Sequence, residues 1–330
     1  MRLTEPGIYF DVAASDYFDD PCPEPSFTQS ISKVLLERSP AHARLEHPRL
    51  AASAPVDAIQ DGTVEKYDKA RAIGDAAHAK MIGRGKQLAV ADFDSWRSGD
   101  AKKFRAAAEA EGKSPILVEH HGIACAMVEA AYEQLAGTEH AMAFDPANGD
   151  GEVVLAWQEE ATWLRTMIDW RVRSIPRCYD YKTTGLSCAP HIVVDRPGEL
   201  GWDIQNAMHE RGLDVLEPAN IGRREFFVVN QEHEPPFALT VIRISESDLT
   251  LGRKKLAVAL DMWRECMTSG IWPLYPRETV LSHPRGWSES RWLEREVAME
   301  ARRQHPAFNQ TQQAIMRSRG PMLTDHLSGG

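Results

Sequence analysis

Two short segments, each with a single aspartate, carry the side chains best suited to chemistry in this chain of 330 residues. Asp169 lies near the end of one extended segment, and Asp180 and Lys182 lie in the extended segment that follows it. Side chains along a strand alternate between its two faces, so Asp180 and Lys182 share a face and Tyr181 points the other way. If the two segments pair as neighbouring strands, Asp169 can meet Asp180 at one end of the sheet.

Two carboxylates and one ammonium group gathered in this way have the composition of a metal-dependent hydrolytic site. Hard cations such as Mg²⁺ take oxygen ligands, commonly one or two carboxylates, and leave their other positions to water and substrate phosphates. A lysine nearby can position or help to deprotonate the attacking water. The arrangement therefore favours metal-assisted hydrolysis of a phosphodiester. The alternative is an exposed salt bridge on an edge strand, because Asp-x-Lys is frequent by chance.

A histidine on a helix predicted over residues 64–82 is a further candidate. Gly74 and His78 are four residues apart and share one helix face, where glycine and alanine let another element approach closely. An imidazole in such a groove suits a metal ligand or a phosphate-directed donor. A core histidine bonded to backbone is the alternative. Asp75 is off this face, and we expect it to be exposed.

A glutamine on a helix predicted over residues 197–212 is the last principal candidate. Gln205 shares a stripe with Trp202 and His209, and its amide could orient Lys182 or contact a phosphate. An amphipathic helix packed through its apolar residues explains the tryptophan on this stripe. It does not explain a glutamine there.

Other ionisable residues rank lower. Glu159 and Glu160 could add a carboxylate, but such a pair more often ends a strand in solvent. The spacing of the remaining histidines matches no metal template, so we assign surface or supporting positions to His120, His121 and His209. The chain contains no Gly-x-Ser-x-Gly elbow, Walker loop or Gly-x-Gly-x-x-Gly loop.

The composition is that of a globular enzyme. With 43% hydrophobic and 26% charged residues, the chain can bury a large core. It contains no apolar signal segment and no run long enough to span a membrane, so we expect a cytoplasmic protein. Five scattered cysteines without a Cys-x-x-Cys pair argue against a disulfide framework or zinc ribbon. The net charge of −10 weakens general attraction to polyanions, although a local basic patch, such as Arg223-Arg224 or residues 253–255, can still bind phosphates.

The order of the predicted elements indicates an α/β protein. After a turn at residues 148–151, strands are predicted at 153–159, 162–172, 175–183, 225–230 and 237–244. Helices are predicted at 30–39, 64–82, 101–111, 119–135, 197–212, 247–269 and 289–303. We expect a central mixed or antiparallel sheet flanked by helices, with a helical N-terminal region. The expected organisation is an irregular arm at 1–25, one domain at 26–276, and a helical extension at 277–330 whose polar tail is frayed or engaged in oligomer contacts.

The ordered motifs resemble those of the RecB-like PD-(D/E)XK nucleases, most closely the phage and prophage exonucleases of RecE type (exodeoxyribonuclease VIII-like). The principal motifs are Gly-Asp-Ala-Ala-His78, Ile168-Asp169, Asp180-Tyr-Lys-Thr-Thr184 and the helical Gln205. Ser39-Pro-Ala-His42 and the stretch 263–275 also resemble segments of such domains. The resemblance covers residues 26–276, and the ordered set is specific where a single motif is not.

This resemblance implies a restriction-endonuclease-like core and metal-dependent cleavage of DNA. In RecE-type enzymes one strand of a linear duplex is degraded 5′→3′, which supplies a single-strand annealing protein. The implied ligands for one or two Mg²⁺ or Mn²⁺ ions are Asp169, Asp180, the carbonyl of Tyr181 and, for a second ion, His78. Lys182 would act on the attacking water, and Gln205 would support Lys182 or the scissile phosphate.

Two departures from the family pattern limit what is carried over. Position 209 is histidine where the family often has tyrosine, which leaves the DNA-facing role of that helix open. The cysteines lack the C-terminal cluster of iron–sulfur relatives, so we expect no such cluster. By analogy the protein forms a homo-oligomer around DNA. A structure-specific endonuclease and a non-catalytic DNA-binding recombination component are the alternatives.

Overall fold

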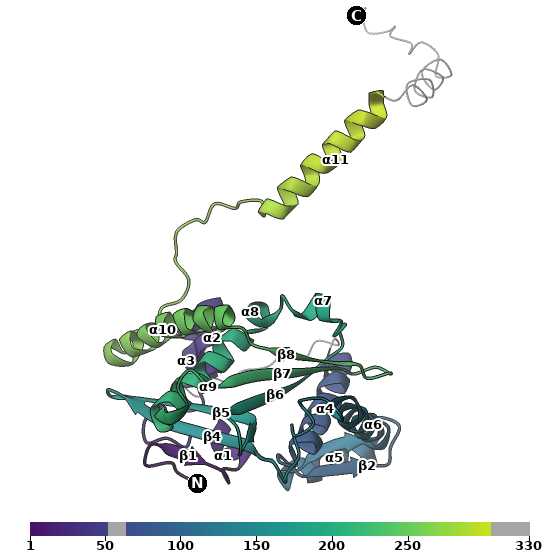
Figure 1. Ribbon diagram of the computed structural model, residues 1–330, viewed down its shortest axis with the longest axis vertical. Coiled ribbons are helices and arrows are strands. Elements are labelled where there is room, and N and C mark those ends of the chain that lie inside the picture. Colours follow the sequence, from purple (N-terminus) through teal and green to yellow (C-terminus); the bar gives the residue numbers. More distant parts are fainter. Residues whose placement is uncertain (52–63, 305–330) are drawn as a thin grey trace, which may run out of the picture. The chain divides into compact units, whose positions relative to one another are not determined.

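A six-stranded mixed sheet forms the centre of the larger of two compact units, Met1–Tyr275 (Figure 1). The structure is a computed structural model that describes residues 1–51 and 64–304. In spatial order the strands are β1 (Gly7–Tyr9), β4 (Gly149–Glu159), β5 (Thr162–Val172), β6 (Arg177–Thr184), β7 (Glu225–Glu232) and β8 (Leu239–Arg243). Neighbours are antiparallel except β6 and β7. That pair is parallel, because a helical crossover joins the two strands.

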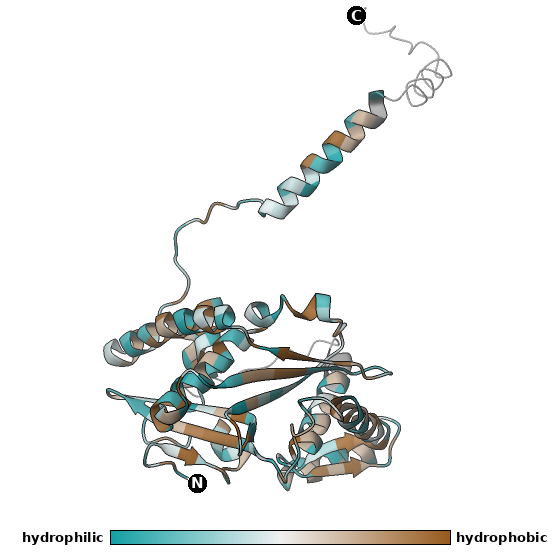
Figure 2. Ribbon diagram, viewed as in Figure 1, coloured by the Kyte–Doolittle hydropathy of each residue, from teal (hydrophilic) through white to brown (hydrophobic). Residues whose placement is uncertain are grey.

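Helices cover both faces of this sheet. The first core contains apolar residues of α2 (Gln29–Glu37), α9 (Trp202–Leu216) and α10 (Glu246–Ser269). The second contains residues of α4 (Val64–Ile82) and α6 (Val118–Leu135). The strands between them are largely apolar in Figure 2, as expected for strands buried on two faces. The predicted α/β class, with a mixed sheet flanked by helices, is confirmed.

A small second sheet beside α4 and α6 was not predicted. It pairs β2 (Leu88–Ala91) with β3 (Ser114–Leu117) in parallel, and α5 (Gly99–Ala110) connects them. In Figure 1 these elements gather around α6, away from α9 and α10. Strands of four residues are too short for a recognisable alternation, so the sequence pattern does not reveal them.

The predicted irregular arm at residues 1–25 is wrong in one respect, because it contains regular structure. β1 pairs with β4, and α1 (Ala14–Phe18) follows. Leu3, Val12, Tyr17 and Cys22 are buried in a third apolar cluster with residues of β4 and β5. Scattered apolar residues therefore attach this segment to the sheet, although no periodic pattern predicts it.

The predicted turn at residues 148–151 is also wrong, because β4 begins at Gly149. A Cβ atom at Gly149 would lie 2.5 Å from Nε1 of Trp170, and one at Gly151 would lie 2.6 Å from Cγ2 of Ile82. Both glycines thus permit close packing inside a strand. A glycine-rich sequence suggests a turn equally well, which explains the error.

The predicted crossover helix at residues 197–212 is divided and extends further. The chain forms α7 (Pro190–Val193), α8 (Pro197–Leu200), α9 and a short 3₁₀ turn, Pro218–Asn220. Gly212 does not end α9, because its role is packing: a Cβ atom there would lie 2.7 Å from the Trp157 ring. α3 (Pro40–Glu46) completes the helices of this unit.

The second unit spans Pro276–Gly330, one residue from the predicted start of the C-terminal extension. Its described part contains α11 (Gly286–Gln304), where a helix was predicted at 289–303. The predicted frayed tail lies outside the described residues beyond 304. Among the described residues, no helix is long and apolar enough to cross a membrane.

Candidate active site

The segments that contain Asp169 and Asp180 pair as neighbouring antiparallel strands, β5 and β6. Trp170 lies opposite Tyr179, and Arg171 lies opposite Cys178. The same register places Asp169 opposite Asp180 on the adjoining step of the ladder. The structure thus brings together the two carboxylates that the sequence analysis paired.

Asp169 receives three polar contacts through a single oxygen, Oδ2. The Tyr181 backbone N–H donates to it at 3.0 Å. Nε2 of His78, from α4, lies 3.2 Å away, and Nζ of Lys182 lies 3.5 Å away. Asp169 is buried, with an exposed fraction of 6%. Helix α4 and strand β6 therefore position a basic group each beside this carboxylate.

Asp180 is held mainly by side chains of α9. Nε2 of Gln205 donates to its Oδ1 at 3.1 Å, and Nε2 of His209 lies 3.6 Å from the same oxygen. Nζ of Lys182 is 4.0 Å away. The other oxygen, Oδ2, is buried and has no hydrogen-bond partner in the described part of the chain. A buried carboxylate oxygen without a donor is unfavourable unless a ligand supplies the missing contact.

The charged groups around Asp169 shift one another's pKa values. Burial by itself raises the pKa of Asp169, but Lys182 and His78 outweigh it and hold that pKa well below its usual range. Burial would lower the pKa of His78, yet Asp169 raises it overall. The pKa of Lys182 is likewise raised by Asp169 and Asp180 against the effect of burial. Without a bound cation, the carboxylate of Asp169 is ionised and Lys182 is protonated at neutral pH.

A cleft of about 700 Å³ gives access to this cluster. Four predicted site residues line it: His78, Asp169, Lys182 and Gln205. Asp180 does not line the cleft, and only 1% of its surface is exposed. The Tyr181 side chain points away into the second core, where its hydroxyl donates to Oε1 of Gln231 at 2.5 Å. The alternation expected along β6 is therefore observed.

The donor set fits a hard divalent cation. Asp169 and Asp180 supply carboxylate oxygens from adjacent strands, and the unpartnered Oδ2 of Asp180 lacks the contact that a cation would provide. Across residues 1–51 and 64–304, no group of three or more His, Cys, Asp or Glu side chains forms a ready metal cage. Mg²⁺ commonly uses only one or two carboxylates and completes its shell with water and phosphate oxygens.

The lower-ranked candidates lie outside the cleft, except Asp75. Glu159 accepts from Arg211 at 2.5 and 2.6 Å, and Glu160 is exposed. His120 and His121 belong to α6 and do not line the cleft. Asp75 lines the cleft, but its side chain is 69% exposed and lies 3.7 Å from Arg71.

Sequence reasoning left one residue of the site between two positions and missed another. His209 was assigned to a surface or supporting position; it is fully buried beside Asp180, and its Nδ1 lies 2.9 Å from Oγ1 of Thr166. Its place on the Gln205 stripe was the available signal. Glu152 was not considered at all, although it is buried and lines the cleft.

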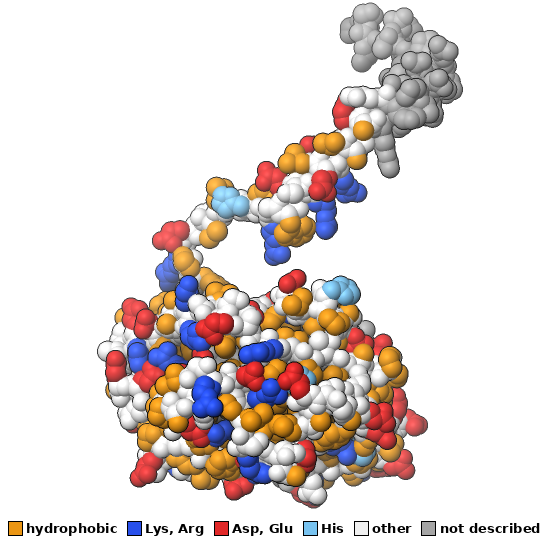
Figure 3. Space-filling model, in the orientation of Figure 1, with side chains coloured by type: hydrophobic (Ala, Val, Ile, Leu, Met, Phe, Trp, Pro, Cys, Tyr) orange, Lys and Arg blue, Asp and Glu red, His pale blue; other side chains and the backbone are white. Residues whose placement is uncertain are grey.

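Three of the five basic residues in the two proposed patches form ion pairs within the protein. Arg224 pairs with Asp214, Arg253 with Glu210 and Glu246, and Lys255 with Asp203. On the face of the molecule shown in Figure 3, acidic and basic side chains are intermixed with apolar ones and form no continuous basic surface. Phosphate binding would therefore depend on cations in the cleft, where Arg71 and Lys86 contribute to the lining.

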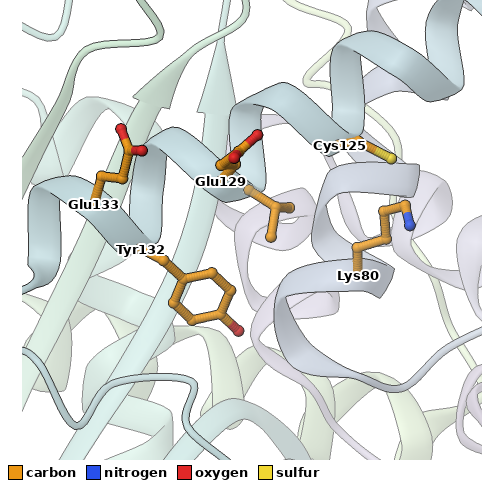
Figure 4. A pocket seen from close by; sticks show the side chains of 6 residues that line it. Lys80, Cys125, Glu129, Tyr132 and Glu133 are labelled. Atoms are coloured by element: carbon orange, nitrogen blue, oxygen red, sulfur yellow. The ribbon is translucent and has the colours of Figure 1, made fainter.

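A second hollow lies between α4 and α6 (Figure 4). Lys80 and Cys125 line it together with four residues one and two turns further along α6: Val128, Glu129, Tyr132 and Glu133. His121 lies 3.8 Å from the Cys125 sulfur. The hollow shares no lining residue with the cleft and contains none of the predicted site residues.

Comparison with known proteins identifies the fold. No family model matches the chain, and no curated protein matches it. A solved structure from Eubacterium rectale, described as a "putative exonuclease", is similar with a TM-score of 0.51 and 12% sequence identity. The likeness covers 86% of this chain and 98% of that one. At this identity it shows a shared fold: the chain has the α/β architecture of a protein described as an exonuclease.

Proposed function

We propose that the protein is a divalent-metal-dependent deoxyribonuclease that degrades linear duplex DNA from its ends, with the 5′→3′ polarity of RecE-type exonucleases. One observation carries the proposal: Asp169, Asp180 and Lys182 converge from adjacent strands beneath an open cleft, with His78 and Gln205 beside them. A structural core has no need of such a charged group. The fold shared with a protein described as an exonuclease supports the nuclease class.

Each residue has a role that its contacts support. Asp169 and Asp180 would hold one or two Mg²⁺ or Mn²⁺ ions, with the carbonyl of Tyr181 as a further ligand. A bound ion of this kind polarises the scissile phosphate and lowers the pKa of a coordinated water. Gln205, which donates to Asp180, fixes the direction of that carboxylate. His78 approaches Asp169 from α4 and would contribute to a second ion.

Lys182 is suited to orient the attacking water and to stabilise charge on the phosphate. Its raised pKa keeps it protonated in the absence of a cation. A cation on the same carboxylates acts in the opposite direction on that pKa, so the lysine becomes a better proton acceptor in the loaded site. Its side chain is 28% exposed at the cleft, within reach of a substrate.

The partners follow from the same proposal. DNA ends would enter the cleft, where Arg71, Lys86 and Lys182 are among the lining residues and could contact phosphates. A single-strand annealing protein and assembly into a homo-oligomer belong to the proposed RecE-like activity.

An end-labelled linear duplex, incubated with Mg²⁺, Mn²⁺ or EDTA, tests the proposal. We expect shortening of the labelled strand with either metal and none with EDTA. Asp180→Ala should reduce cleavage to background, and Lys182→Ala should reduce it by about 10²–10⁴-fold. Glu160→Gln changes an exposed carboxylate that does not line the cleft; it is the matched control and should retain full activity. Substantial cleavage by Asp180→Ala would refute the assignment.

A covalently closed circular duplex separates the alternatives. The proposed exonuclease leaves it intact, whereas a structure-specific endonuclease of this fold cuts a circle that contains the appropriate structure. Metal-independent DNA binding without cleavage of either substrate would indicate a non-catalytic recombination component.

A further inference from the structure

Glu152, on β4, is a largely buried residue whose carboxylate has no partner among the described residues. Only 6% of its surface is exposed. Across the described ranges, residues 1–51 and 64–304, its side chain makes no hydrogen bond and no ion pair. Its backbone is also unusual, with a φ of +50° in the left-handed region. Unlike Oδ2 of Asp180, its carboxylate oxygens are not completely enclosed, so water or a bound cation can reach them and supply the contacts that the protein does not.

The sheet aligns Glu152 with both acidic residues of the proposed site. It lies between two β4–β5 register pairs, Gly151 with Trp170 and Val153 with Ile168, and therefore faces Asp169 across the ladder. Asp169 in turn lies opposite Asp180 on β6. Three carboxylates thus occupy the same level of three consecutive strands, which are spaced about 4.8 Å apart.

The local distortion of β4 and β5 occurs at this pair. Ile168 belongs to the first core, whereas Trp170, two residues further, belongs to the second. In a regular strand these two side chains would share a face. The change of face falls at Asp169 and Glu152, so both carboxylates lie where the two cores meet.

The charge around these residues is unbalanced. Lys182 lies within 4.0 Å of both Asp169 and Asp180, and His78 lies 3.2 Å from Asp169. No cation lies this close to Glu152 in the described part of the chain; His78 and Arg84 attract it from further away, and Asp169 repels it. The three carboxylates therefore carry more negative charge than the adjacent basic groups neutralise.

Glu152 is accessible to a small solute from two sides. It lines the active-site cleft and also a smaller hollow of about 440 Å³ between α1 and residues 84–86. The two hollows share Glu152 together with Ala14, Gly85 and Lys86. A hydrated cation can thus reach the carboxylate without unfolding of the sheet.

We propose that Glu152 and Asp169 share the second divalent cation, bound with its water molecules on the β4 side of Asp169, so that Glu152 is a ligand of this ion in addition to His78. The proposal rests on the proposed nuclease function and assigns to it a ligand outside the motif residues. Because the side chains alone form no complete cage, water and a phosphate oxygen supply the other ligands. The second ion would bind the side of the phosphate away from Asp180.

Mn²⁺ binding to the full-length protein without DNA tests this assignment. Electron paramagnetic resonance of free Mn²⁺ gives the number of bound ions and their affinities. We expect two ions for the wild type and for Glu160→Gln, which is a matched control because Glu160 also has a positive φ, +54°, but is 80% exposed. For Glu152→Gln we expect one ion, with at least a tenfold loss of affinity at the second site. Glu152→Asp retains the charge and should keep two ions, the second bound more weakly.

Thermal unfolding distinguishes ligand binding from a merely structural role. In EDTA, Glu152→Gln should unfold at a higher temperature than the wild type, because it removes an unpaired buried charge. It should gain less stabilisation from Mn²⁺. If Glu152→Gln retains two ions, or lowers the EDTA melting temperature without changing Mn²⁺ binding, the inference is wrong and the nuclease proposal stands. If the wild type binds no Mn²⁺, and Asp180→Asn changes neither Mn²⁺ binding nor DNA cleavage, the inference about Glu152 and the nuclease proposal are both wrong.

Discussion

The two ends of strand β5 differ in how completely their buried charges are paired. Near its start, Arg165 donates from Nη1 to Oδ1 of Asp20 at 2.9 Å. Ser26 donates to the same carboxylate through its hydroxyl at 2.7 Å and its backbone N–H at 2.9 Å, and His47 lies 3.4 Å away. Burial raises the pKa of Asp20, but His47, Arg165 and Ser26 lower it overall. This cluster is electrically balanced and well hydrogen-bonded.

At the other end of the strand, the carboxylates outnumber their partners. Oδ2 of Asp180 lacks a donor, and Glu152 lacks any close cation, within the described residues. Both clusters lie along one cleft, which Arg165 and Asp169 line together. The contacts of the Asp20 cluster attach the N-terminal segment to the sheet. The unmet contacts of the Asp169 cluster are what the proposed cation site would require.

The largest expected contrast between the two ends is in stability. Asp20→Ala leaves Arg165 buried without its carboxylate and should cost about 3–5 kcal/mol of the free energy of unfolding. Asp180→Asn removes excess negative charge and should leave the metal-free protein as stable as the wild type or more so. Urea unfolding in EDTA measures both. Equal destabilisation by the two substitutions would contradict the distinction.

A smaller effect, on metal affinity, is expected from His209, whose Nε2 lies 3.6 Å from the proposed metal ligand Asp180. Histidines and amides that orient a metal-binding carboxylate commonly contribute about 10–100-fold to metal affinity. We therefore expect His209→Ala to weaken Mn²⁺ binding by about that factor, as measured by calorimetry. His121→Ala, on α6 outside the cleft, is the control and should have no effect. An unchanged affinity in His209→Ala would assign that histidine to packing alone.

The smallest expected effect is the pH dependence of the metal-free protein. The pKa of Asp169 is lowered, so its contribution to stability is present above the ordinary value of 3.8 and is lost as the pH falls below it. The pKa of His78 is raised, so its contribution is present below 6.5 and is lost as the pH rises through its higher folded value. Melting temperatures in EDTA should therefore decline on both sides of this window. His78→Asn should remove the alkaline decline; a profile identical to the wild type would show that the ion pair with Asp169 contributes nothing.

Much of the fold and of the motif cluster could be predicted from sequence. Long apolar strands and the two-residue alternation indicated β5 and β6, and the spacing of Asp169 and Asp180 indicated a meeting of carboxylates. His78 and Gln205 could be assigned to helices from their surroundings. The remaining step, convergence of those helices on the strands, depended on the family resemblance, because local pattern does not encode which helix packs on which strand.

The residues that were missed depend on tertiary packing. Glu152 follows Asn-Gly-Asp-Gly, which suggests a turn, and only the close packing of Gly149 and Gly151 makes the segment a strand. His209 is buried because α9 packs its stripe against β5, where Thr166 accepts or donates a bond to it. Residues 1–25 contribute a strand because β4 leaves an edge for β1 to pair with. None of these contacts is visible in a local pattern.

Anomalous diffraction from a crystal soaked in Mn²⁺ tests most directly whether the Asp169 end of β5 binds a cation. We predict the strongest anomalous peak within about 2.5 Å of carboxylate oxygens from both Asp169 and Asp180. No peak is expected at the balanced Asp20 cluster. Ordered crystals at millimolar Mn²⁺ that show no peak beside Asp169 and Asp180, or that place the strongest one elsewhere, would contradict the proposed metal site.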